Sequence, residues 1–292
     1  MNDELRFIKG FQENEKLRES FNGLAGSVFG ISFEEWYQKG YWTDKYIPFS
    51  FTYGDKVVAN VSVNLIDLLI NGEKKTGIQL GTVMTDPAYR NQGLSKRLME
   101  IVLEEYRNVD LMYLFANDTV LDFYPKFGFK QAQESQYIMD VKQAPGKKKG
   151  FRKLNGSVDK DQRLIYDLAL RRMPGSQTFG TVNTAELLMF YSIYVFPEDM
   201  YYLEQQDTLV FCKEAGDQLH LFDMVSSTNI DLETILRAFV SEDTRQAILH
   251  FTPEDPSKYE IVPFRGTEVL FVKSKDDVTF PAYFKHPVTA QA

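Results

Sequence analysis

The sequence is short of cysteine and histidine and has no long apolar run, and each shortage excludes a class of protein. A single cysteine, Cys212, rules out an intramolecular disulfide and argues against a stapled secreted scaffold. Cys212 lies in an apolar run and is interpreted as a buried strand residue. The three histidines, His220, His250 and His286, form no metal-binding spacing, so we expect no metal. The longest apolar stretch, Leu187 to Phe196, is too short to span a bilayer.

Positive charge is also scarce. Lysine and arginine total 33 against 41 acidic residues, which gives a formal net charge of -8 at pH 7. A protein that grips a phosphate backbone usually has the opposite balance, so we expect no nucleic-acid partner. The N-terminus has no basic segment followed by an apolar one, so we also expect no signal peptide and no membrane partner. A cytoplasmic protein is the default expectation.

The remaining composition is that of a globular protein, and the chain is long enough for two domains. It has 292 residues, of which 43% are hydrophobic and 25% charged. Proline and glycine interrupt a lysine run near the middle of the chain, and we interpret residues 144–150 as a linker between domains at 1–143 and 151–292. The basic residues from Lys147 to Lys153 are open to a second interpretation as an anion site.

Periodicity and turn residues predict the order β-α-α-β-β-β-α-β-α-β in the first half. The expected helices and strands are residues 5–8, 13–29, 33–40, 47–53, 57–69, 76–85, 93–106, 111–115, 119–123 and the strand from Phe129 onward. The turn Gly54-Asp55 indicates a hairpin between the second and third strands.

The second half begins in the same way. The sequence FRKLNG, from Phe151 to Gly156, echoes LRFIKG, from Leu5 to Gly10. The further elements expected are helices at 161–172, 184–196 and 231–240 and strands at 208–213, 219–225, 247–252 and 269–273. The fold class is therefore α/β (α+β) with a mixed central sheet in each of two tandem domains. The shared order indicates either a duplicated fold or two unrelated α+β domains.

The most informative segment is GTVMTDPAYRNQGLS, from Gly81 to Ser95, where a strand leads through a loop into a helix. Backbone N–H groups of such a loop point into one concavity, and the helix N-terminus adds a positive dipole end. This arrangement is a receptor for phosphate, to which Arg90 would add a charge. The loop lacks the Gly-Lys-Ser/Thr of a Walker loop and the three glycines of a dinucleotide fingerprint.

This segment resembles the first signature of the GNAT superfamily of acetyl-CoA-dependent N-acetyltransferases. Residues 90–95, RNQGLS, are similar to the pattern R/Q-x-x-G-x-G/A, with Ser95 in place of the last small residue. The strand residues Val83, Met84 and Thr85 precede it as in that family. About thirty residues later, Asn117 and the run FYPKFGF from Phe123 resemble the second signature, N-x(6)-Y-x-x-x-G-F. The resemblance covers residues 1 to about 140, and the second half carries neither signature.

The resemblance implies a GNAT fold with acetyl-CoA, as acyl donor, between two splayed strands. The pantetheine arm would contact Val83, Met84, Thr85 and Asn117. The pyrophosphate would lie on the loop that opens the helix, whose residues are Arg90, Asn91, Gln92, Gly93, Leu94, Ser95 and Lys96. The resemblance further implies that the Val83 amide polarises the thioester carbonyl.

By the same resemblance, Tyr124 would be the general acid that protonates the departing thiolate. Packing of Tyr124 in the core beside Phe123 and Phe127 is the alternative. The general base is not identified, because Gln79 stands where a histone-acetylating branch of the family keeps a glutamate. A carboxylate from elsewhere, a water chain, the C-terminal carboxylate or an acceptor already deprotonated are the remaining choices.

An aromatic and acidic cluster near the first helices is our candidate for the acceptor site. Glu34, Glu35, Trp36 and Tyr53 would bind a cationic amine through carboxylate and cation–π contacts. Alternatively, these side chains pack on the sheet while both glutamates are solvated.

The sequence therefore predicts an acetyltransferase that acts on a small-molecule or peptide amine. A non-catalytic module that binds or senses acetyl-CoA or CoA is the alternative. We expect the second domain to be a degenerate GNAT-like module. Its apolar helix from Thr184 to Phe196 is interpreted either as a face for a homodimer or as a buried core helix.

Overall fold

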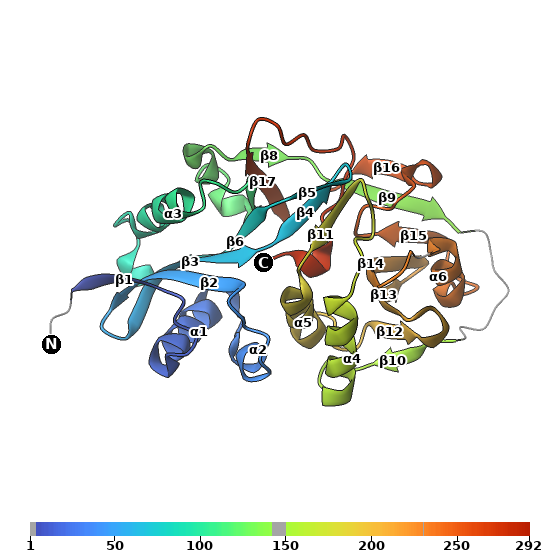
Figure 1. Cartoon of the computed structure of the whole chain (residues 1–292), viewed down its shortest axis with the longest axis horizontal. Helices are drawn as coiled ribbons and strands as arrows, with labels where there is room; N and C mark the ends of the chain where they lie inside the picture. Colours follow the sequence, from blue (N-terminus) through green and yellow to red (C-terminus); the bar gives the residue numbers. More distant parts are fainter. Residues whose placement is uncertain (1–3, 142–149, 230) are drawn as a thin grey trace.

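Two seven-stranded sheets and one three-stranded sheet make up the framework of this computed structural model (Figure 1). It describes residues 4–141, 150–229 and 231–292. The first sheet has the spatial order β1 (Leu5–Lys9), β2 (Tyr46–Tyr53), β3 (Lys56–Leu65), β6 (Gly77–Thr85), β7 (Leu111–Asn117), β17 (Glu268–Ser274) and β8 (Lys130–Ala132).

The second sheet repeats this order with strands drawn mainly from the second half. They are β10 (Arg152–Leu154), β12 (Met200–Leu203), β13 (Thr208–Ala215), β14 (Gln218–Ser226), β15 (Gln246–Leu249), β9 (Ser135–Asp140) and β16 (Glu260–Pro263). A third sheet joins β11 (Phe179–Val182) of the second half to β4 (Asp67–Ile70) and β5 (Glu73–Lys75) of the first.

The two large sheets exchange one strand each, at the same place. The fourth and fifth strands run parallel in both sheets, β6 with β7 and β14 with β15. The sixth position is then filled from the other half, by β17 in the first sheet and by β9 in the second. This shared order supports the predicted duplication. The predicted division of the chain does not follow the sheets at these two strands, because β9 precedes the linker and β17 follows it.

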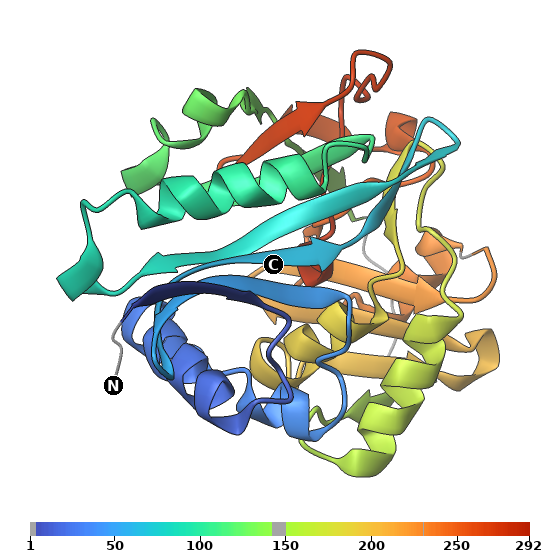
Figure 2. The ribbon, with the colours of Figure 1, turned by 60° about the vertical axis from the view of Figure 1, so that its left-hand side comes forward.

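Helices cover both faces of the first sheet. Helix α1 (Glu15–Phe29) begins where the Asn14 side chain accepts the Leu17 N–H at 3.3 Å and ends at Gly30, whose φ of 71° is left-handed. Helix α3 (Leu94–Glu105) packs its apolar face on the opposite side, so that α1 and α3 enclose the sheet (Figure 2).

The remaining helices are α2 (Glu34–Gln38), α4 (Asp159–Leu170), α5 (Ala185–Tyr194) and α6 (Leu232–Phe239). Of these, α2 and α5 bring the halves together in one hydrophobic core. The rings of Phe33 and Phe190 lie 5.4 Å apart, and the Trp36 indole N–H donates to the Glu186 carbonyl at 2.8 Å. Lys45 pairs with the Glu186 carboxylate at 2.9 Å. As a result, α5 of the second half packs against α2 of the first half.

Several expectations from the sequence are settled by this packing. The apolar stretch at α5 is a core helix, since Leu188 and Met189 are fully buried, and Cys212 is a buried residue of β13. The short helix expected at 119–123 is instead two 3₁₀ turns, Asp118–Val120 and Tyr124–Phe127. The expected linker and most of the basic run at 147–153 lie outside the described residues. None of the described helices has the length and apolar character needed to cross a membrane.

Candidate active site

The site begins where β6 and β7 stop pairing. The two parallel strands pair from Gly77 opposite Leu111 to Leu80 opposite Leu114. Beyond that point β6 continues to Thr85 and β7 to Asn117 without a further pair in the described register. Their unpaired edges therefore face each other across an opening in the sheet.

A β-bulge distorts β6 at this opening. Asn60 of β3 pairs with Met84 and Ser62 pairs with Gly81, so that Val61 alone lies opposite both Thr82 and Val83. Thr82 has a φ of 49°, a left-handed conformation that is costly for a β-branched residue. The Asn60 amide holds the bulge by donating to the Thr82 carbonyl at 2.9 Å, and the Tyr46 and Thr82 hydroxyls hydrogen-bond at 2.8 Å. Strain that is held in this way is typical of functional sites.

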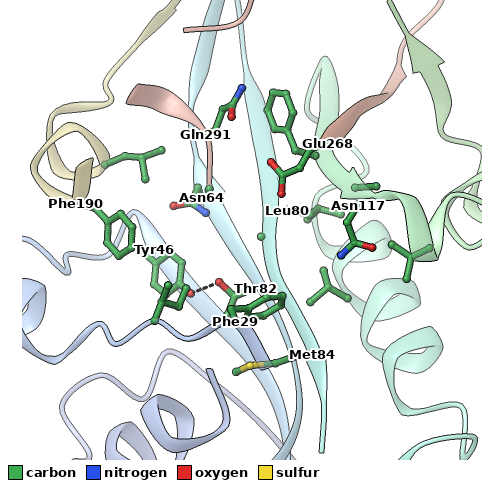
Figure 3. A pocket seen from close by; sticks show the side chains of 18 of the residues that line it. Phe29, Tyr46, Asn64, Leu80, Thr82, Met84, Asn117, Phe190, Glu268 and Gln291 are labelled. Carbon is green, nitrogen blue, oxygen red and sulfur yellow. Dashed lines mark hydrogen bonds between the residues drawn. The ribbon is translucent and has the colours of Figure 1, made fainter. Parts of the chain in front are cut away.

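A cavity of about 400 Å³ fills the opening (Figure 3). Strands β6 and β7 contribute residues 80–85 and 115–117, and Ser95 and Tyr124 lie at the side of α3. The opposite wall is aromatic and comes from both halves. Phe29, Phe33, Trp36 and Tyr46 belong to the first half, and Leu187, Phe190 and Tyr191 belong to α5. The second half therefore forms part of this site directly.

The loop that leads from β6 ends in an uncapped start of α3, although its earlier amide at Ala88 is bonded to the Asp86 carboxylate. Asn91 and Gly93 are left-handed, with φ of 62° and 73°. Gly93 is the N-cap of α3, and no side chain caps this described helix start. A Cβ on Gly93 would have open space around it, so the glycine serves the backbone conformation and not the packing. The free amides and the helix dipole make this end of the cavity suited to an anion.

Ser95, the departure from the family signature, ties the loop to the strand. Its hydroxyl lies 2.6 Å from the Thr85 hydroxyl, which joins the start of α3 to the end of β6. Serine therefore keeps the loop in place instead of disturbing it.

The corresponding helix start in the second half is capped by a side chain and is not available to an anion. Strand β14 also outruns its parallel partner after Leu221, but Asp231 caps α6 with its carboxylate, which accepts from the Glu233 and Thr234 amides at 3.2 and 3.3 Å. The Asp231 carboxylate therefore already binds the backbone amides that an anionic ligand would need.

Tyr124 lies buried at the side of the cavity that faces α3. It is 5% exposed and packs against Phe123, Phe129 and Phe271, the last of which is carried by the exchanged strand β17. Burial raises the pKa of its phenol to about 12, so the hydroxyl is protonated at neutral pH.

Asn117 and Glu268 stand side by side on the other face. They are register partners at the ends of β7 and β17, and both line the cavity. Asn117 accepts the Thr119 N–H at 3.1 Å. Glu268 is exposed to the cavity, yet desolvation by the surrounding protein raises the pKa of its carboxyl group. No pattern in the sequence singles out Glu268, because its position depends on the exchange of β17.

Gln79 has a structural role here. It is fully buried beneath the cavity and donates to the Tyr113 hydroxyl at 3.0 Å and to the Ala290 carbonyl at 2.9 Å, while its own carbonyl accepts the Ala292 N–H. These bonds fix the segment that carries Gln291 and Ala292 into the cavity lining. Gly81 permits this close approach, since a Cβ there would come within 2.8 Å of the Ala292 backbone.

Of the four residues expected to bind the acceptor, the structure brings only Trp36 into the cavity lining. Glu34 is instead paired with the buried Arg18 at 2.9 Å, and this partner lowers the pKa of Glu34 against the opposing effect of desolvation. Glu35 is exposed on the outer side of α2, and Tyr53 stacks on Tyr89 with ring centres 5.3 Å apart.

The positions expected to bind the cofactor form a continuous line. Val83, Met84, Thr85, Ser95 and Asn117 line the cavity, and Arg90, Asn91, Gln92, Gly93, Leu94 and Lys96 continue from it along the uncapped loop. In the described parts of the chain, no group of three or more histidine, cysteine, aspartate or glutamate side chains is arranged to hold a metal ion.

Comparison with known proteins agrees with this geometry. Residues 12–132 match the family model of the acetyltransferase (GNAT) domain. Three solved structures share the fold over most of the chain. A GCN5-related N-acetyltransferase from Kribbella flavida is 18% identical with a TM-score of 0.57, over 93% of this chain and 71% of that one.

The second is a conserved protein of unknown function from Enterococcus faecalis V583, titled a probable N-acyltransferase. It is 16% identical with a TM-score of 0.59, over 93% of this chain and 72% of that one. Eis1 from Mycobacterium abscessus is 13% identical with a TM-score of 0.56, over 91% and 72%. At these identities the likeness concerns the fold alone.

Proposed function

Because residues 12–132 match the family model of the acetyltransferase (GNAT) domain, we propose that this protein transfers an acetyl group from acetyl-CoA to a primary amine. The acceptor is a small molecule or a peptide whose amine attacks the thioester directly. The observation that carries the proposal is the continuous path from the opening between β6 and β7 to the uncapped start of α3.

The residues on this path fit the parts of acetyl-CoA in order. Amides of Gln92 to Lys96 would bind the pyrophosphate, with added charge from Arg90 and Lys96. The free edge of β6 at Val83 and Thr85 would pair with the amides of the pantetheine arm, as an added strand does. Asn117 would bind this arm from the edge of β7, on the far side of the opening.

The reaction needs a polarised carbonyl and an acid for the leaving thiolate. Val83 lies in the bulge without a partner in the described register of β3, so its N–H is suited to the thioester oxygen. Tyr124 would give its phenolic proton to the thiolate and regain one from water. The raised pKa keeps the Tyr124 hydroxyl protonated at neutral pH, so its proton is present when the thiolate forms.

Gly93 provides the experiment that tests the proposal. Aspartate and asparagine both tolerate the left-handed conformation at this position, and the space around it is open. Gly93→Asp would place a negative charge where the pyrophosphate binds, whereas Gly93→Asn has nearly the same shape without the charge. We expect isothermal titration with acetyl-CoA to show binding by the wild type, a modest loss in Gly93→Asn and a loss of 100-fold or more, about 2.7 kcal/mol, in Gly93→Asp.

Equal affinity of the two variants would place the pyrophosphate elsewhere, and no binding by the wild type would overturn the proposal. A turnover assay against a panel of amines then separates transfer from mere binding. Tight binding of acetyl-CoA with no acetylation of any amine would favour a sensing module.

A further inference from the structure

Glu268 is delivered to the cavity by the second half of the chain. It opens β17 and faces Asn117 across the antiparallel pair, and directly opposed residues point to the same face of a sheet. Figure 3 shows its carboxylate directed into the cavity, beyond Leu80 and beside Asn117. Among the described residues that line the cavity, Glu268 is the only one with a formally charged side chain.

The alternation of side chains along β7 places Glu268 and Tyr124 on opposite faces of the first sheet. Phe115, two residues before Asn117, packs with Leu270 and Phe284 on the side of the second half. Leu114 and Ala116 pack with Tyr124 on the side of α3. An acid and a base are therefore available on either side of the opening in which the thioester would lie.

The surroundings of Glu268 favour its use as a base. Desolvation raises the pKa of its carboxyl group, and its charge adds to the burial that raises the pKa of the Tyr191 phenol on α5. A carboxylate with a raised pKa accepts a proton more readily than an ordinary one. The Asn117 amide beside it is neutral and offers no competing charge.

The wall that faces this carboxylate is apolar and aromatic. Phe29, Phe33, Trp36, Tyr46 and Phe190 come from α1, α2, β2 and α5. A cation that lies against this wall can be bound by the faces of the rings. The rest of the wall binds apolar groups.

We propose that Glu268 is the catalytic base of the acetyl transfer and that the acceptor is a primary amine on an apolar or aromatic body. This inference rests on the proposed acetyltransferase function. It assigns to the second half of the chain both a reacting group and part of the acceptor wall.

The proton balance of the step is complete. The ammonium gives one proton to the Glu268 carboxylate, and the freed nitrogen lone pair attacks the thioester carbonyl carbon. The carbon–sulfur bond breaks, the thiolate takes the Tyr124 proton, and the nitrogen loses its second proton to water as the amide forms. The products are the acetylated amine, the free thiol and one net proton.

Glu268→Gln tests the base, with Glu260→Gln as the matched control. Both glutamates begin a strand of the second half and are exposed, but Glu260 lies on β16 away from the cavity. With phenethylamine as acceptor, we expect Glu268→Gln to lower kcat at pH 7 by about 10²- to 10⁴-fold. Its rate is then expected to rise tenfold per pH unit toward the pKa of the free amine, whereas the wild type reaches a plateau above the pKa of Glu268.

Besides the carboxylate of Ala292, which Glu268→Gln leaves in place, the other titratable groups that line the described cavity are the phenols of Tyr46, Tyr124 and Tyr191. Burial raises the pKa of each of them, so they do not titrate in the range of the plateau. A Glu268→Gln variant that keeps the wild-type rate and pH profile would overturn the assignment. Faster acetylation of spermidine than of phenethylamine would overturn the acceptor class.

Binding of the amine can be measured without acetyl-CoA. Trp36 lines the cavity, and its ring lies 6.1 Å from that of Trp42, the other tryptophan of the chain. Titration of phenethylamine, followed by their fluorescence, is expected to show at least tenfold weaker binding by Glu268→Gln than by Glu260→Gln. Equal binding would refute the acceptor site. If the protein does not bind acetyl-CoA, the proposed function is refuted, but the amine titration still shows whether the acceptor site exists.

Discussion

Tyr124 places its hydroxyl among apolar side chains, and this hydroxyl is not needed for the packing of the ring. Three aromatic rings surround the phenol, and phenylalanine would keep all of their contacts. We therefore expect Tyr124→Phe to lower kcat by about 10²- to 10⁴-fold, the usual contribution of a general acid. The affinity for acetyl-CoA and the melting temperature are expected to stay close to those of the wild type, as measured by steady-state kinetics, titration and thermal unfolding.

Tyr283 provides the matched control, since it is 58% exposed and its change to phenylalanine removes only a surface hydroxyl. Tyr124→Phe with full activity would make the residue a packing group, as the alternative interpretation of the sequence holds. A large fall in melting temperature would show that the hydroxyl supports the fold instead.

Site residues whose role depends on their own backbone conformation and on their neighbours in the sequence can be predicted from the sequence. Gly93 and Ser95 belong to one strand–loop–helix unit, and the loop conformation follows from that local order. The acceptor carboxylate is not predictable in this way. The aromatic neighbours of Glu34 in the sequence predict a role in acceptor binding, but its charge is paired with that of Arg18. Glu268, in contrast, reaches the cavity only because β17 pairs with β7.

At the scale of elements, helices and long strands follow the periodicity of the sequence, and short strands do not. Strands β11, β12 and β16 each have four residues and were not predicted. Two of them are defined by partners from the other half of the chain, since β11 pairs with β4 and β16 pairs with β9, whereas β12 pairs with β10 and β13 of its own half. Four residues are too few for a period-two pattern to emerge, so long-range contacts decide their conformation.

A buried ion pair fixes the segment that follows β17. Lys285 and Glu134 pair at 2.9 Å, with side chains 2% and 4% exposed, and Glu134 also accepts the His286 N–H at 2.9 Å. Lys285→Met would leave the Glu134 carboxylate buried with no cationic partner. We expect a loss of about 3–5 kcal/mol in the free energy of unfolding, measured by urea denaturation.

The double variant Glu134→Gln/Lys285→Met is the control, because glutamine accepts the same N–H without a charge. It is expected to recover most of the loss, since no unpaired ion remains in the interior. If the single and double variants lose the same amount, the cost comes from the ammonium contact with the Phe264 ring at 3.8 Å and not from the stranded carboxylate.

At the scale of the molecule, the two halves depend on each other in three places. They exchange β9 and β17, they share the hydrophobic core between α2 and α5, and they meet in the small sheet of β4, β5 and β11. The cavity lies among these contacts, with the uncapped start of α3 in the first half and its aromatic wall in both halves. The start of α6, which corresponds to that of α3, is capped by the carboxylate of Asp231.

This mutual dependence predicts that neither half folds alone. Residues 1–143 lack β17, so β7 would lose one of its two neighbours, β8 its neighbour and β9 its sheet; residues 151–292 lack β9 in the same way. Exposed strand edges of this kind favour aggregation. We expect each segment, produced separately, to be insoluble or without cooperative thermal unfolding. When produced together, the two are expected to copurify as a one-to-one complex that acetylates phenethylamine.

The control is a full chain with a protease site in place of residues 144–150, folded intact and then cut. It is expected to stay assembled and active, because the strand exchange holds the halves without a covalent link. A folded, monomeric segment 1–143 that binds acetyl-CoA would establish an autonomous domain. If that segment also acetylated phenethylamine at the full rate, the reaction would need neither Glu268 nor the wall of α5, and the base would have to lie within the first half.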